Sequence, residues 1–245
     1  MYRDTRRTRQ ALPTIILAVL ALGGCEGPSP EAEPGARPAV SPPPAAEVPG
    51  AEGPVIDEVQ WDLQQARNDF VKGSFEDCAE GIERAGGRLQ HLAQRSVPGV
   101  RQDLEASALA LGELAPRVRD GAVASVVQLD SAMAIADYAM ARYHHAAAEE
   151  AVVERAALHS GREISLVARD LTAAAEYLET GFGRLEQPID SSAASAISAA
   201  RDMGEQMVRR RPVDQAEVEQ VLAGLGQGIE RLKEMVMPQS RGSAS

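Results

Sequence analysis

Residues 122–158 read AVASVVQLDSAMAIADYAMARYHHAAAEEAVVERAAL, and this stretch indicates the fold class of the chain. Apolar side chains recur along it every three or four positions, at Val126, Leu129, Met133, Ala136, Met140, Tyr143 and Ala147. This spacing places them on one face of an α-helix. At about 1.5 Å per residue the helix would span about 55 Å. A seam of that length favours a bundle of long helices.

Six further amphipathic helices are expected around this one, and no segment shows the period-two alternation of a strand. The seven expected helices cover residues 55–71, 75–92, 98–115, 122–158, 161–187, 191–211 and 214–236. Short loops between amphipathic helices favour antiparallel neighbours. The sequence therefore predicts an all-α domain over residues 55–237, either an antiparallel bundle or stacked hairpins of about seven helices.

Local signals set the expected ends of these helices. Ser74 and Asp77 have the spacing of a capping box, as do Ser160 and Glu163, and Asp190 and Asp214 are good N-cap residues. Proline lacks a backbone N–H and clashes with the preceding turn, so Pro116 should end or kink the third helix at about residue 115.

The first 25 residues have the layout of an export signal. Arg3, Arg6, Arg7 and Arg9 precede the apolar run 11–22, and Leu22-Gly23-Gly24-Cys25 closes it. This segment resembles the lipobox signal of bacterial lipoproteins. The resemblance implies cleavage between Gly24 and Cys25, a diacylglycerol on the Cys25 thiol, and often an acyl chain such as palmitate on the new amine. Glu26 stands where an aspartate often directs retention in the inner membrane, so the resemblance favours the outer membrane, facing the periplasm.

Two other interpretations of this segment stay open. A membrane-spanning anchor needs about 20 apolar residues, whereas the run 11–22 is shorter and Pro13 interrupts its start. A plain secretory signal would be cleaved with Cys25 as a bystander. Lipidation has the clearest physical consequence, because two or three acyl chains hold a protein stably on a membrane whereas one binds marginally.

The remaining composition excludes one class of partner and predicts a tether. Residues 1–24 contain four arginines and Asp4, so the rest of the chain carries 21 basic and 35 acidic residues, a net charge of −14. Such a chain lacks the basic footprint of a nucleic-acid-binding protein. Nine of residues 26–54 are proline, so residues 25–54 are expected to form a lipidated, disordered tether. Residues 238–245 are expected to form a disordered tail.

The candidate chemistry lies on the predicted fourth helix. His144, His145 and Glu149, with His159 just beyond, are candidate metal ligands, and Asp130, Asp137 and His144 repeat every seven residues along one flank of the seam. A metal site needs three or four converging ligands. The spacing is also common on solvated helices, so a charged or partner-facing surface is the favoured interpretation. The chain contains no haem, nucleophile-elbow or phosphate-loop motif, so neither a cofactor nor catalytic activity is expected.

Several less common residues are assigned to the core. If Cys25 carries lipid, Cys78 has no cysteine partner, and its place on an apolar stripe predicts a small buried side chain. Trp61 and Phe70 are expected in the core, and Met203, Met207, Met235 and Met237 are expected to fill gaps among alanines rather than bind copper(I). Gly224, Gly226 and Gly228 indicate either close contact with another helix or a weak point.

Residues 59–92 resemble a tetratricopeptide-type hairpin. Gly73, Phe75, Cys78, Ile82 and Ala85 match that motif in type and spacing. The aromatic residue of the first helix is displaced by one position, and no copy follows 34 residues on, whereas a solenoid needs several repeats. A single helical hairpin with chance similarity is therefore the favoured interpretation.

These features lead to two functional expectations. The first is a membrane-anchored, noncatalytic helical lipoprotein that acts in the cell envelope as a protein-interaction or structural module, with an envelope protein as partner. The second is a ligand- or metal-binding periplasmic helical bundle with a stress or sequestration role, which would use the region of His144 to His159 or the methionines.

Overall fold

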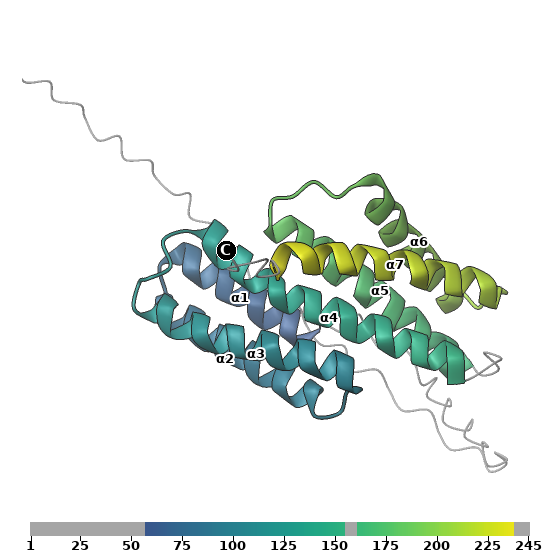
Figure 1. Cartoon of the computed structure of the whole chain (residues 1–245), viewed down its shortest axis with the longest axis horizontal. Coiled ribbons are helices and arrows are strands. Elements are labelled where there is room, and N and C mark those ends of the chain that lie inside the picture. The colour runs from purple at the N-terminus through teal and green to yellow at the C-terminus, as the bar shows by residue number, and fades with distance from the viewer. Residues whose placement is uncertain (1–56, 155–160, 238–245) are drawn as a thin grey trace, which may run out of the picture. The chain divides into compact units, whose positions relative to one another are not determined.

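The computed structural model describes residues 57–154 and 161–237. Within these ranges the chain forms seven α-helices and no strand, which confirms the all-α prediction (Figure 1). The helices are α1 (Glu58–Lys72), α2 (Phe75–Ala93), α3 (Pro98–Arg119), α4 (Val126–Glu154), α5 (Gly161–Arg184), α6 (Ser191–Val208) and α7 (Gln215–Val236). None of these helices has both the length and the apolar character required to cross a membrane. The expected signal segment, Cys25, the tether, Ser160, His159 and the tail lie outside the described residues.

Helix α4 lies between two groups of helices and packs against both. Helices α1, α2 and α3 form a four-helix group with it, and α5, α6 and α7 form a second one (Figure 1). Buried residues therefore occur around the whole circumference of α4, including the consecutive run from Ala136 to Ala141. Four neighbouring helices approach α4 closely. This close packing explains why residues 122–158 are rich in small apolar residues.

The N-caps of α6 and α7 follow the sequence prediction. Asp190 accepts hydrogen bonds from the backbone N–H groups of Ser192 and Ala193, and Asp214 accepts one from Ala216. Asp57 caps α1 in the same way through the N–H of Val59. These carboxylates satisfy donors that the first helical turn leaves free.

The expected capping box at Ser74 is wrong. The Ser74 side chain makes no cap hydrogen bond, and its ψ of 69° lies outside the extended region that an N-cap residue uses. Instead, Gly73 ends α1 in the left-handed region with φ 80°, and the N–H groups of Gly73 and Ser74 bond to the carbonyls of Phe70 and Asp69. This Schellman turn fixes the conformation of Ser74 before α2 begins.

The expected end of α3 at Pro116 is also wrong. Helix α3 continues to Arg119, and the N–H of Asp120 bonds to the Pro116 carbonyl. Pro116 lies in the last turn of α3. It removes one backbone N–H donor from the helix, but the residues after it stay helical. Helix α4 begins later than expected, because Ser125 accepts from the Gln128 N–H at 3.2 Å and Gln128 Oε1 accepts from the Ala124 N–H at 2.9 Å. This pair closely resembles a capping box, which the sequence prediction missed.

The core assignments hold in part. Cys78 is fully buried as predicted, Met203 and Met207 are also buried, and Met235 is exposed. Trp61 was wrongly placed in the core, because it is 58% exposed. It lies about half a helical turn away from Val59 and Leu63, the residues that α1 buries. Phe70 is only half-buried, with its ring edge-to-face against Phe75.

The α7 glycines allow close helix packing, which was one of the two interpretations. A Cβ atom at Gly228 would lie 2.7 Å from Leu178 Cδ2 on α5, and one at Gly224 would lie 3.3 Å from Ala196 Cβ on α6. A Cβ at Gly226 would lie 3.3 Å from His145 Nε2 on α4. Helix α7 therefore approaches three helices of its group through positions that lack a side chain.

Candidate functional site

Three polar residues of α4 line the side that faces α1 and α5. Asp130, Asp137 and His144 are spaced by seven residues, and their partners all come from these two helices or the cap of α1. The heptad spacing noted in the sequence thus does mark one face of the helix. The three residues belong to two separate clusters, one around Asp130 and Asp137 and one around His144.

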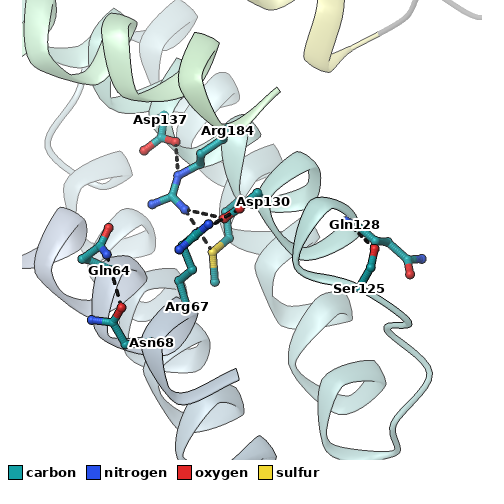
Figure 2. A network of polar contacts seen from close by, with 9 residues as sticks. Gln64, Arg67, Asn68, Ser125, Gln128, Asp130, Asp137 and Arg184 are labelled. Carbon is teal, nitrogen blue, oxygen red and sulfur yellow. Dashed lines mark hydrogen bonds and ion pairs between the residues drawn. The ribbon is translucent and has the colours of Figure 1, made fainter. Parts of the chain in front are cut away.

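The first cluster is a buried ion-pair network (Figure 2). Arg184 from α5 donates from Nε to Asp137 Oδ2 at 2.6 Å and from Nη1 to Asp130 Oδ1 at 3.2 Å. Arg67 from α1 donates from Nε to both oxygens of Asp130 at 2.9 Å. Burial raises the pKa of Asp137 to about 6 although Arg184 opposes the rise, and its Oδ1 has no partner among the described residues. Two arginines and two aspartates balance in charge, so this cluster joins three helices and leaves no charge to attract a ligand.

The second cluster centres on the buried imidazole of His144. Its Nδ1 lies 3.0 Å from Asp170 Oδ1 on α5, and its Nε2 lies 3.3 Å from Asp57 Oδ2 at the start of α1. Burial alone would lower the pKa of His144, but the hydrogen bonds with Asp170 and Asp57 outweigh it and raise the pKa above its ordinary value. An imidazolium donates both N–H groups, so it satisfies one carboxylate on each side.

Asp57 has two functions in this cluster. One oxygen caps α1 and the other faces His144. Burial alone would raise the pKa of Asp57, but its interactions with His144 and Tyr177 lower it below the ordinary value. The ring of Tyr177 stacks on His144 with centroids 5.9 Å apart. The start of α1 is therefore held against α4 and α5 by a charged group.

This arrangement predicts a pH dependence of stability. Because the folded pKa of His144 is raised, its stabilising contribution is complete below the unfolded value of about 6.5 and is lost as the pH rises through the folded value. We expect the free energy of unfolding in urea to fall as the pH rises above about 6.5, and the fall to be largely absent in His144→Gln. His91→Gln is the matched control, since His91 is exposed and should leave the slope unchanged. Equal slopes in wild type and His144→Gln would contradict this assignment.

The three candidate metal ligands within the described residues, His144, His145 and Glu149, do not form one site. His145 is buried on another side of α4, where Nε2 donates to the Leu222 carbonyl on α7 at 2.9 Å, and its Nδ1 lies 3.4 Å from Glu149 Oε2. His159 lies outside the described residues. Among the described residues no group of three or more His, Cys, Asp or Glu side chains is arranged to hold a metal ion. The favoured interpretation of a partner-facing surface is wrong for His144 and His145, because both are buried between helices.

A pocket of about 640 Å³ opens beside His144, between the start of α1, the second half of α2, the middle of α4 and the middle of α5. Its apolar lining includes Val59, Leu92, Met140, Tyr143, Ala173 and Tyr177. A concave site of this size, apolar with a few polar groups, is typical of small-molecule binding. Sequence analysis missed this pocket, because its walls come from four helices that are distant in the chain.

One wall of the pocket is basic. Arg84, Arg88, His91 and Arg95 follow each other along one side of α2 and its end, and Arg169 of α5 also lines the pocket. Asp62 of α1, buried behind this wall, accepts from Arg84 Nε at 3.1 Å and from Arg88 Nε at 2.7 Å. The spacing of three or four between the basic residues of α2 was the available sequence signal.

Comparison with known proteins gives no relative for this chain: no family model, no curated protein and no solved structure matches it. The fold and the site describe an all-α protein in which two four-helix groups share a central helix, with a pocket that has a basic wall.

Proposed function

We propose that this chain is a lipid-anchored protein of the bacterial cell envelope whose helical domain binds a small molecule in the pocket beside His144. The pocket is the observation that carries the proposal. It favours the ligand-binding alternative over a protein-interaction or structural module, because a module of that kind needs no 640 Å³ pocket. We propose a small molecule rather than a metal as the ligand, because neither His144 nor His145 belongs, among the described residues, to a group of three or more metal-ligating side chains that could hold an ion.

We propose binding without chemical conversion. His144 is the titratable group in the pocket best suited to acid–base catalysis, but both of its ring nitrogens face carboxylates. A general base needs a free nitrogen within hydrogen-bond reach of the substrate. His144 therefore holds the walls of the pocket together.

The proposed anchor is Cys25, with cleavage after Gly24 and with the outer membrane as the favoured location because Glu26 follows. Residues 26–54 would act as a proline-rich tether with a reach of about 80–90 Å at most. The net charge of −14 beyond the signal would repel anionic headgroups. The domain would thus work at a distance from the membrane that holds it.

Filling the pocket tests the proposal. Gly87 lines the pocket on α2, and a Cβ there would meet no atom within 4 Å, so Gly87→Phe should fill the space without strain. The full chain would be equilibrated by dialysis against a small-molecule extract of cell envelopes, and retained compounds identified by mass spectrometry. We expect wild type to concentrate a compound and Gly87→Phe to lower its retention by about tenfold or more, the effect of losing about 1.4 kcal/mol of binding.

Gly112→Phe is the matched control. Gly112 is exposed on α3, a Cβ there also meets no atom within 4 Å, and it does not line the pocket. This variant should retain the compound like wild type. Retention of every compound equally by wild type and Gly87→Phe would overturn the proposal.

A further inference from the structure

The buried part of the pocket offers a ligand no uncompensated charge. The buried residues of its lining are Val59, Met140, His144 and Tyr177. Of these, His144 is the one that carries a charge, and its two ring nitrogens already face Asp170 and Asp57. A ligand that enters this part of the pocket therefore meets apolar side chains and aromatic rings, the Tyr177 ring being stacked on His144.

The arginines of the basic wall are matched by carboxylates. The ion pairs join Arg84 and Arg88 to Asp62, Arg88 to Glu58, and Arg169 to Asp170. Neither Asp62 nor Asp170 lines the pocket, and both are buried, so they hold the guanidinium groups from behind. Charges that are paired in this way attract a further ionic group only weakly, because their fields largely cancel.

Two charges of the lining have no ion pair with any described residue, and they are opposite in sign. Arg95 lies just beyond the end of α2 and Glu176 lies on α5, and both residues are exposed. His91, the other histidine of the lining, is exposed as well. Such groups stay hydrated, and water and salt screen their attraction for an ion. The pocket as a whole therefore selects neither an anion nor a cation.

The balanced charges and the apolar lining favour the same kind of ligand. Transfer of a charged group from water to a site without a free opposite charge is unfavourable. Contact of apolar ligand surface with Val59, Met140 and Tyr177 is favourable, because it removes that surface from water. Building on the proposed function, we infer that the ligand is an uncharged, mainly apolar organic molecule that lies against these residues and the ring of Tyr143.

Three competitors with the same naphthalene ring test the inference. Naphthalenemethanol is neutral, naphthoate is an anion and naphthylmethylammonium is a cation. Each would displace the neutral fluorescent probe N-phenylnaphthylamine from the full chain, and the part of the probe signal that Gly87→Phe removes reports on the pocket. We expect naphthalenemethanol to displace the probe at a concentration about tenfold or more below that of either ion. An ion that competes as well as the alcohol, or better, would overturn the inference.

Glu58→Gln tests the cause of this preference. Glu58 is exposed, and removing its charge leaves Arg88 to share Asp62 with a second arginine. We expect naphthoate to compete about two- to fivefold better in Glu58→Gln than in wild type, the range of a partly exposed ion pair, and naphthalenemethanol to compete equally in both. Glu76→Gln is the matched control, because Glu76 is an exposed partner of Arg119 that does not line the pocket. If naphthoate gains nothing in Glu58→Gln, the inference is overturned, because the pairing of the wall charges would then not be what excludes an anion.

Gly87→Phe separates this inference from the proposed function. If Gly87→Phe lowers probe binding but an ion is the best competitor, the pocket binds a charged ligand, and the inference fails alone. If Gly87→Phe leaves probe binding unchanged, the proposed function fails with it.

Discussion

Replacing Arg184 with methionine is expected to lower the free energy of unfolding of the helical domain by about 3–5 kcal/mol, the usual cost of removing one partner from a buried ion pair. Arg184 is 7% exposed, and its guanidinium contacts the carboxylates of Asp137 and Asp130. Methionine keeps most of the side-chain volume but leaves Asp137 fully buried without a counter-ion. Urea unfolding followed by circular dichroism measures the change.

Two further variants show whether the stranded carboxylate causes the loss. Adding Asp137→Leu to Arg184→Met should restore part of the stability, because it removes the buried charge. Arg201→Met is the surface control: its ion pair with Glu179 is partly exposed, and such pairs contribute less than about 1 kcal/mol. An equal loss of unfolding free energy in Arg184→Met and Arg201→Met would contradict this prediction, because the buried network would then stabilise the domain no more than a surface ion pair does.

Replacing Cys25 with serine is expected to abolish membrane attachment of the chain. Serine cannot form the thioether to diacylglycerol, and each methylene of a lost acyl chain removes about 0.8 kcal/mol of membrane affinity. Cells would be fed a clickable palmitate analogue, and the label and the membrane fraction compared between wild type and variant. Wild type should carry label and stay with the membranes, whereas Cys25→Ser should carry none.

The second cysteine provides the matched control. Cys78 is fully buried on α2, and burial raises the pKa of its thiol to about 11, so it stays unreactive. Cys78→Ala should therefore keep both label and membrane attachment. Label on Cys25→Ser, or wild type recovered with its first methionine, would overturn the proposed anchor.

Local sequence signals predicted the helices and several of their ends. The period of three to four residues is a property of each helix alone, so Leu129, Met133 and Met140 were correctly assigned to a buried face. Asp190 and Asp214 act on their own first turns, which explains why both caps were predicted correctly. The predictions at Ser74 and Pro116 failed where two local signals competed, a Schellman turn before Ser74 and an intact last helical turn after Pro116.

The sequence by itself determined that Asp130, Asp137 and His144 share one side of a helix, because seven residues complete about two helical turns. Only the tertiary structure decided what that side meets. Asp130 pairs with Arg67 and Arg184, 63 and 54 residues away, and His144 pairs with Asp57, 87 residues away. Helical periodicity is set by bonds between near neighbours, whereas the choice of partners depends on how two helix groups pack around α4. The pocket and its basic wall exist only after that packing.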